Sequence, residues 1–195
     1  YNTIKSIAIG TNEVYGASES GILVFDRADK SITSINTLNG LSGTGISYIA
    51  YDTERAQLLI AYSDGNLDIL KNNTVTNFNR LKISSITGSK KINHIGFHGQ
   101  AAYLSTDYGI VVFDLNQLDL KETWRDLGKG GTSLNVLGTT FRADRIFIAT
   151  SSGVLAGNLG DNLLDFNSWK RFDTGDLEGP VQSVATFNTR IYAAI

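Results

Sequence analysis

Apolar and polar residues alternate in short runs along this chain, and residues typical of turns separate the runs. At the start of the sequence, apolar residues recur at strand-like spacing in four segments, residues 4–10, 14–18, 22–25 and 31–36. Runs of this length, bounded by Gly, Asn, Asp and Ser, are typical of β-strands joined by tight turns. The fourth run alternates apolar and polar residues, as a half-exposed outer strand does. The pattern predicts four antiparallel strands.

The same pattern returns at a nearly constant interval. The stretch YGASESGILVFD at 15–26 reappears as YLSTDYGIVVFD at 103–114. A glycine recurs every 44 residues, at Gly21, Gly65, Gly109 and Gly153. A small residue precedes each glycine and recurs once more, at Ala17, Ala61, Ser105, Ala149 and Ala194. Two residues three apart, mostly apolar, open each copy: Ile4/Ile7, Ile46/Ile49, Ile92/Ile95, Val136/Thr139 and Val181/Val184.

Four strands in a repeat of this length predict the blade of a β-propeller. Leucine-rich repeats are shorter, helical repeats need a 3.6-residue period, and no Trp-Asp dipeptide of the WD40 type occurs. We therefore expect an all-β fold, a β-propeller with four-stranded antiparallel blades, in a single domain over 1–195. The expected blades are 4–45, 46–91, 92–135, 136–180 and an incomplete fifth at 181–195. Because the fifth copy stops early, we expect a part of a longer protein.

The repeated positions have structural explanations. The small residues are expected where the second strand of each blade packs between neighbouring blades, and the glycines where a hairpin turn needs a positive φ. Asp64-Gly65 favours a type I′ turn. The segment 114–128 could form a weak amphipathic helix, but the repeat phase predicts a turn and then an outer strand there.

Composition and charge exclude several classes of protein. Charged residues make up 18% and the formal net charge is −2, so no overall basic field would hold a nucleic acid. No apolar run is long enough to cross a membrane as a helix. The sequence has no Cys, which excludes disulfides, thiolate metal sites and a cysteine nucleophile. No motif indicates a cofactor.

Few residues suggest chemistry. His94 and His98 could share one face of a strand, but no third metal ligand lies nearby in the sequence. Asp52 and Glu54 resemble a carboxylate pair, yet solvated turn residues explain them better. The same holds for Asp161 and Asp165, and no calcium-loop pattern occurs.

Two further features could bind ligands. The segment GKGGTS at 128–133 is rich in glycine but lacks the order of a phosphate-binding loop, so a loop between blades explains it. Trp124 and Trp169 are expected to cover the flanks of blades, with stacking on sugar rings as the alternative. Propellers most often bind at the mouth of the channel, which indicates the loops 37–45, 79–91, 126–135 and 173–180. We expect no catalytic residue, and no individual binding residue is identified.

The segment 38–70 carries a family resemblance. It resembles the blade pattern of two-component regulator propellers of Bacteroidota. The matching residues are Asn39-Gly40-Leu41-Ser42, the pair Ile46/Ile49, and Leu59-Ile60-Ala61 with Gly65. Within that superfamily, the chain is most similar to the N-terminal propeller of the PorZ family of the type IX secretion system. The similar stretches are AYSDGN at 61–66 and AYLSTDYGIVVFDL at 102–115, followed by ETW at 122–124.

This resemblance implies a protein with two propellers and a C-terminal anchoring domain at the outer membrane or cell surface. It implies a non-enzymatic module whose partners are proteins of the attachment complex, or the surface lipopolysaccharide to which cargo is linked. The alternative is the periplasmic sensor propeller of a hybrid histidine kinase that recognises an oligosaccharide. A propeller enzyme such as a polysaccharide lyase is a third possibility, for which the repeat-matched positions supply no polar cluster.

Overall fold

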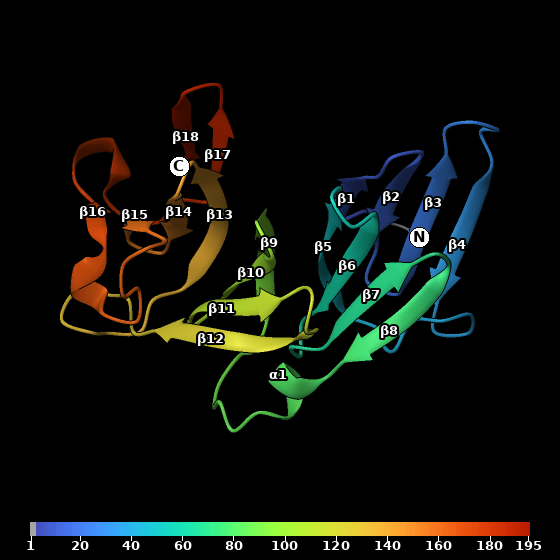
Figure 1. Ribbon diagram of the computed structural model, residues 1–195, viewed down its shortest axis with the longest axis horizontal. Helices are drawn as coiled ribbons and strands as arrows, with labels where there is room; N and C mark the ends of the chain where they lie inside the picture. Colours follow the sequence, from blue (N-terminus) through green and yellow to red (C-terminus); the bar gives the residue numbers. More distant parts are fainter. Residues whose placement is uncertain (1–2) are drawn as a thin grey trace. The chain divides into compact units, whose positions relative to one another are not determined.

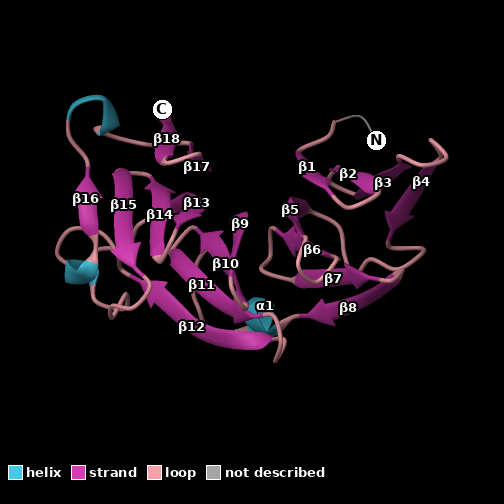
Figure 2. Cartoon of the chain, turned by 45° about the horizontal axis from the view of Figure 1, so that its top comes forward, coloured by secondary structure: helices cyan, strands magenta, loops and turns pink. Residues whose placement is uncertain are grey.

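The computed structural model describes residues 3–195, which form a nearly all-β protein with 52% strand and 5% helix. Figure 2 shows how few helical turns interrupt the strands. The chain divides into two compact units, residues up to Ile92 and residues from Asn93 onward. Tyr1 and Asn2, which the expected domain 1–195 includes, lie outside the described residues.

The first unit contains two four-stranded antiparallel sheets, which Figure 1 shows in blue and green. The first sheet has the order β1 (Ser6–Ile9), β2 (Glu13–Ala17), β3 (Gly21–Asp26) and β4 (Ile32–Asn36). The second has the order β5 (Ile46–Asp52), β6 (Gln57–Tyr62), β7 (Leu67–Lys71) and β8 (Thr74–Phe78). A short helix, α1 (Arg80–Ile83), follows β8.

The second unit repeats this construction. One sheet is formed by β9 (Ile92–His98), β10 (Ala101–Thr106), β11 (Gly109–Asp114) and β12 (Asp119–Arg125). The next is formed by β13 (Val136–Arg142), β14 (Arg145–Thr150), β15 (Gly153–Asn158) and β16 (Lys170–Phe172), with the 3₁₀ turns η1 (Phe166–Ser168) and η2 (Gly175–Leu177) on either side of β16. A two-stranded sheet of β17 (Ser183–Phe187) and β18 (Arg190–Ala194) completes the unit.

These successive four-stranded sheets confirm the predicted all-β propeller fold. Residues 114–128 contain the strand β12 rather than a helix, as the repeat phase predicts. The helix α1 within 79–91 is an addition that the repeat does not predict. The division of residues 1–195 into blades at the boundaries given above stays a prediction. No helix among residues 3–195 has the length and hydrophobicity needed to span a membrane.

The column of small residues is buried as predicted in four of its five members. Ala17, Ala61, Ser105 and Ala149 have no exposed surface, whereas Ala194 is exposed. Ala17 packs in a core shared by the first two sheets, together with Ile49 and Ile60. A larger side chain there would separate the sheets, since interiors packed at this density do not accommodate extra volume.

The glycine column is more varied than its spacing suggests. φ is positive at Gly65 (84°), Gly109 (138°) and Gly153 (81°), as predicted, but Gly21 has no φ in the left-handed range, so the prediction was wrong there. A Cβ at Gly109 would collide with the carbonyl oxygen of Trp124 on the next strand, so glycine is needed there for space as well as for φ.

The second sheet departs from the repeat at its central hairpin. In the other sheets a hydroxyl closes the hairpin: Ser18, Thr106 and Thr150 donate to the carbonyl oxygens of Gly21, Gly109 and Gly153 at 3.0, 3.0 and 2.8 Å. In the second sheet Tyr62 and Asn66 form the closing pair and three residues lie between them. Asp64 has no positive φ, so the predicted type I′ turn was wrong. The extra residue makes this a longer hairpin with Gly65 in the left-handed conformation.

Candidate ligand-binding pockets

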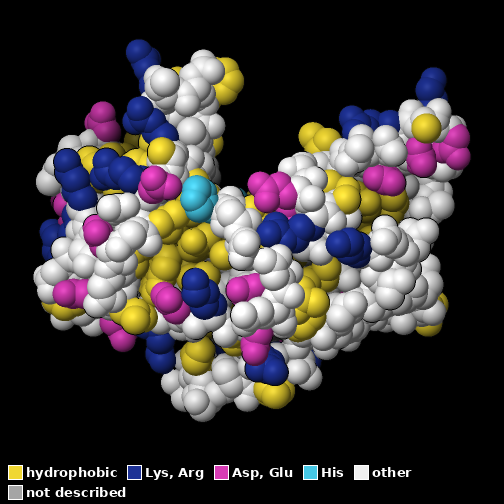
Figure 3. Space-filling view, viewed as in Figure 1, with side chains coloured by type: hydrophobic (Ala, Val, Ile, Leu, Met, Phe, Trp, Pro, Cys, Tyr) yellow, Lys and Arg dark blue, Asp and Glu magenta, His cyan; other side chains and the backbone are white. Residues whose placement is uncertain are grey.

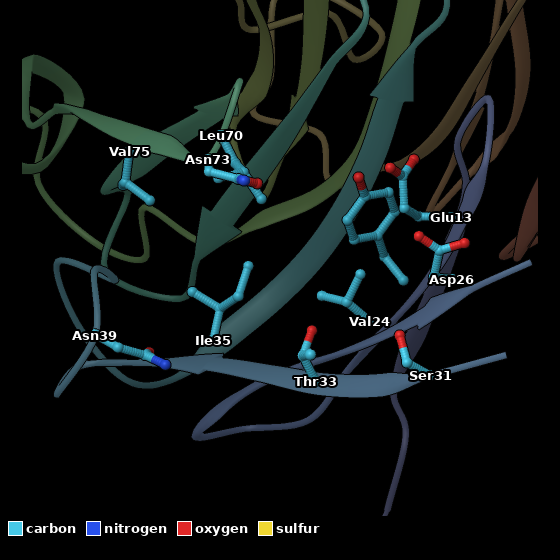
Figure 4. Close-up of a pocket in the computed structure, with 11 residues that line it drawn as sticks. Glu13, Val24, Asp26, Ser31, Thr33, Ile35, Asn39, Leu70, Asn73 and Val75 are labelled. Carbon is cyan, nitrogen blue, oxygen red and sulfur yellow. The ribbon is translucent and has the colours of Figure 1, made fainter. Parts of the chain in front are cut away.

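A pocket of about 450 Å³ lies between the first two sheets, a volume within the range of ligand sites. We call it the Glu13 pocket. Three strands contribute one wall, because cross-strand partners share a face: Glu13 with Asp26, and Tyr15 with Val24. Thr33 and Ile35 of β4 extend this wall. Figure 4 shows Leu70 and Val75 on the opposite side, so the pocket has apolar walls.

One end of the Glu13 pocket is acidic. Glu13 and Asp26 are directly opposed on β2 and β3, and Figure 4 shows their carboxylates side by side. The nearest cation in the sequence is Arg27, but its guanidinium donates to the carbonyl oxygens of Gly10, Thr11 and Asn12. Within residues 3–195 neither carboxylate forms an ion pair. Opposed like charges are destabilising in a sheet.

Tyr15 places a phenol next to these carboxylates. Burial, followed by the negative charge of Glu13, raises the pKa of Tyr15 to about 12. The hydroxyl therefore stays protonated at physiological pH and keeps its hydrogen-bond donor. The ring stacks on Tyr51 with 6.0 Å between centroids, which fixes its orientation.

The other end of the Glu13 pocket carries amide side chains. Asn39 is held in place because its Nδ2 donates to the Ser34 carbonyl oxygen at 2.8 Å and its Oδ1 accepts from Asn36 N at 2.6 Å. Asn73 lies in the turn before β8, where φ is 60°. Figure 4 shows Asn39 and Asn73 away from the two carboxylates. The pocket thus has amides at one end, carboxylates at the other, and both apolar and hydroxyl side chains between them.

A buried polar network supports the loop that supplies Asn39. Asp68 has no exposed surface and accepts from Ser42 N at 2.8 Å, Tyr62 Oη at 2.6 Å and Asn77 Nδ2 at 2.7 Å. Burial, and then the hydrogen bond to Asp68, raises the pKa of Tyr62. Tyr62 replaces the hydroxyl residue that closes the other hairpins, so the departure from the repeat creates this network.

A second pocket, of about 530 Å³, lies in the second unit; we call it the Tyr103 pocket. It occupies the same position relative to its sheets, since Ala101 and Asp114 are opposed as Glu13 and Asp26 are. Ala101 therefore takes the place of the Glu13 carboxylate, and Lys121 and Asp144 line the pocket as well. The two pockets share a tyrosine and an aspartate but differ in charge.

The histidines do not assemble a metal site with other ligands. His94 is half-buried, and its loss of solvation lowers its pKa to about 4, whereas His98 stacks on Phe141 with 5.0 Å between centroids. Among residues 3–195 there is no group of three or more His, Cys, Asp or Glu side chains that could hold a metal ion. A neutral imidazole is the physical result of this loss of solvation.

The carboxylate pairs serve turns. Asp52 is 2% exposed, so the expectation that it is solvated was wrong. It accepts from the backbone nitrogens of Glu54 and Arg55 and pairs with the Arg55 guanidinium at 3.2 Å, which anchors the turn after β5. Asp165 accepts from Asn167 N at 2.9 Å and caps η1, whereas Asp161 is exposed.

The tryptophans are core residues. Trp124 and Trp169 are 5% and 4% exposed and meet edge to face at 5.9 Å between centroids. Their indole nitrogens donate to Glu122 Oε2 and to the Leu163 carbonyl oxygen. The alternative that they stack on sugars was wrong, because no ring face is available to a ligand.

The loops predicted to bind are well bonded and contribute little to the pockets. Lys129 of the segment 128–133 pairs with Asp173 at 2.9 Å, and the next regular element is the strand β13, not a helix. In the loop 79–91, Lys90 donates to the carbonyl oxygens of Lys82 and Ser84. Of the four loops, only 37–45 lines one of the two pockets, through Asn39.

Matches between repeats do not reveal the Glu13 pocket. The signal lies in a difference between repeats. The opposed positions that hold Glu13 and Asp26 in the first sheet hold Ala101 and Asp114 in the third and Arg145 and Asn158 in the fourth. A comparison of opposed pairs along the repeat would have shown like charges at the first.

The comparisons with known proteins support the fold. The profile of the PorZ N-terminal β-propeller domain of the type IX secretion system matches residues 14–170. A solved structure of PorZ, an essential bacterial surface component of that system in Porphyromonas gingivalis, superimposes with a TM-score of 0.83 at 23% identity over 97% of this chain. The extracellular domain of the hybrid two-component system BT4673 of Bacteroides thetaiotaomicron superimposes with a TM-score of 0.78 at 11% identity over 97% of this chain.

The chain spans only about a quarter of these solved chains, 25% of PorZ and 26% of the BT4673 domain. No curated protein matches its sequence. At these identities the structural likeness bears on the fold alone.

Proposed function

Because the chain belongs to the PorZ N-terminal β-propeller family, we propose that it is a non-enzymatic propeller module of a type IX secretion system at the cell surface. The observation that carries this proposal is the match of the family profile over residues 14–170, which covers most of the described strands. The proposed partners are proteins of the complex that attaches secreted cargo, or the surface lipopolysaccharide to which cargo is linked.

The side chains support a binding role rather than a catalytic one. The titratable residues singled out from the sequence are occupied with turns, with capping or with core packing, as Asp52, Asp165 and His94 show. The two pockets instead combine apolar side chains with polar and charged groups that can orient a bound ligand. On the face in Figure 3, Lys and Arg side chains lie among Asp and Glu and form no continuous basic patch.

Deletion of the gene in the bacterium that encodes it tests the secretion role. Cell, membrane and medium fractions are compared for secreted cargo, by size and by reaction with antibody to lipopolysaccharide. We expect cargo to appear in the medium at the size of the unattached form, and the complete gene supplied on a plasmid to restore attachment.

Two outcomes would contradict the proposal. Normal attachment of cargo, together with altered transcription of genes for oligosaccharide uptake, would favour the sensor of a hybrid histidine kinase. Turnover of a polysaccharide by the purified protein, abolished by a single substitution, would contradict the non-enzymatic role.

A further inference from the structure

Among the four-stranded sheets of residues 3–195, the first alone has two opposed carboxylates at this position of the repeat, and they lie in the Glu13 pocket. In the second sheet the register places Gln57 opposite Lys71. The third sheet has Ala101 opposite Asp114, and the fourth has Arg145 opposite Asn158. The fold therefore forms without two acids here. Nothing in the packing of the blade requires Glu13 and Asp26 together.

The pair also has no internal cation to balance it within the described residues. The Asp26 carboxylate accepts one hydrogen bond, from Ala28 N at 2.7 Å, and the Glu13 carboxylate lies beside the Tyr15 hydroxyl. Arg27 is bound to backbone carbonyl oxygens, and Lys5, which directly precedes β1, pairs with Glu19 at 3.1 Å. Two half-buried carboxylates thus retain acceptor capacity toward the pocket.

The rest of the pocket fits an extended apolar stem. Val24, Ile35, Leu70 and Val75 line it between the acidic end and the amides of Asn39 and Asn73, and the hydroxyl residues Ser31 and Thr33 line its β4 side. A sugar would need an aromatic face to stack on, but Tyr15 is 8% exposed and its ring is stacked on Tyr51. An aliphatic chain that ends in a cation matches both the walls and the charge.

We propose that the Glu13 pocket binds a basic side chain of a protein partner, with arginine as the best fit. A guanidinium has donors enough, in one plane, to bridge the carboxylates of Glu13 and Asp26. The methylene stem lies along Val24 and Leu70, and the amides of Asn39 and Asn73 meet the polar backbone of the partner. This inference goes beyond the proposed secretion role and would stand if that role failed.

The test titrates Nα-acetyl-arginine amide into the ¹⁵N-labelled full chain and follows backbone amide shifts. We expect shifts grouped at residues 13–39 and 70–75, and at least fivefold weaker binding in the double variant Glu13→Gln with Asp26→Asn. Asn at position 26 keeps the oxygen that accepts from Ala28 N, so the turn is preserved. The neutral isostere Nα-acetyl-citrulline amide should not bind measurably.

A matched control variant removes two charges elsewhere. The double variant Glu54→Gln with Asp161→Asn also loses two negative charges, at exposed residues outside the pocket. It should bind the arginine probe as tightly as the parent protein does. The Glu13→Gln variant alone should also melt at a higher temperature without probe, since it removes an opposed like charge. That readout shows that the variant is folded.

Three outcomes would overturn the inference. They are equal binding of the citrulline and arginine probes, shifts confined to residues outside the pocket, and binding of a chito-oligosaccharide that the double variant does not weaken. Normal cargo attachment in the gene deletion would overturn the secretion role alone and would leave this pocket assignment intact.

Discussion

At the scale of single residues, Asp68 shows how a departure from a repeat becomes structural. Its carboxylate is fully buried and holds three donors, from Ser42, Tyr62 and Asn77. Removal of an acceptor leaves buried donors unsatisfied, at a cost of about 1–3 kcal/mol for each group. The residue therefore stabilises the loop 37–45 and the hairpin of β6 and β7 together.

We expect Asp68→Ala to lower the free energy of unfolding in urea by roughly 3 kcal/mol, and Tyr62→Phe, which removes one donor, to lower it by about 1 kcal/mol. Asp161→Ala, at an exposed position, is the control and should change it by less than about 0.5 kcal/mol. Equal effects of the Asp68 and Asp161 substitutions would show that the network contributes nothing to stability.

Gly109 is constrained by space as well as by conformation. Its φ is 138°, and a Cβ would meet the Trp124 carbonyl oxygen, whereas Gly130 has a φ of 68° and no atom within 4 Å of the position that a Cβ would occupy. We expect Gly109→Ala to destabilise by roughly 3 kcal/mol or more, and Gly130→Ala by about 1 kcal/mol, the cost of the left-handed conformation alone. Thermal and urea unfolding of both variants measure the difference. Similar losses would mean that the collision is relieved by a small shift of β12.

At the scale of elements, the repeat predicts strands well and turns less well. Strand positions follow from apolar residues that must be buried. The repeat therefore predicts a strand within 114–128, where the local sequence also allows a helix, and the structure has β12 there. The turn at Asp64-Gly65 was misjudged because one extra residue in the hairpin is invisible to a 44-residue spacing. The burial of Trp124 and Trp169 depends on side chains brought together from different strands, which local sequence does not reveal.

The strand β9 carries a titratable group, His94, that folding removes in part from water. Burial lowers the pKa of His94 to about 4 from 6.5, so the unfolded chain binds a proton in a pH range where the folded chain does not. His94 therefore favours folding above about pH 6.5, and this contribution is lost as the pH falls toward 4. The shift corresponds to a loss of about 3 kcal/mol.

Urea unfolding at about pH 7.5 and pH 4.5 tests this dependence. The parent should lose more stability between these values than His94→Asn does, by about 2–3 kcal/mol. His98→Asn, at the half-buried end of the same strand, is the matched control. Identical pH dependence in the parent and His94→Asn would show that residue 94 does not titrate differently on folding.

At the scale of the whole chain, the fold is a series of similar sheets, and within each unit neighbouring sheets bury one another's faces. The separate cores contain Ala17 and Ile49 in the first unit, and Trp124 and Trp169 in the second. Sequence periodicity predicts this organisation because every blade must bury the same positions. It does not predict the Glu13 pocket, because the acids there are additions to one blade.

The two compact units should also open as separate cooperative units, since each has hydrophobic core clusters of its own. Under native conditions, Asp68→Ala should speed hydrogen exchange at the amides of β5–β8 by tenfold or more, because a loss of more than about 1.4 kcal/mol in the free energy of opening has that effect. Exchange at the amides of β13–β15 should stay within about twofold of the parent. Gly109→Ala should show the reverse, with faster exchange in β10–β12 and little change in β2–β7. Faster exchange in both units from either substitution would mean that the chain opens as one unit, and the stability of the Glu13 pocket would then depend on residues of the other unit.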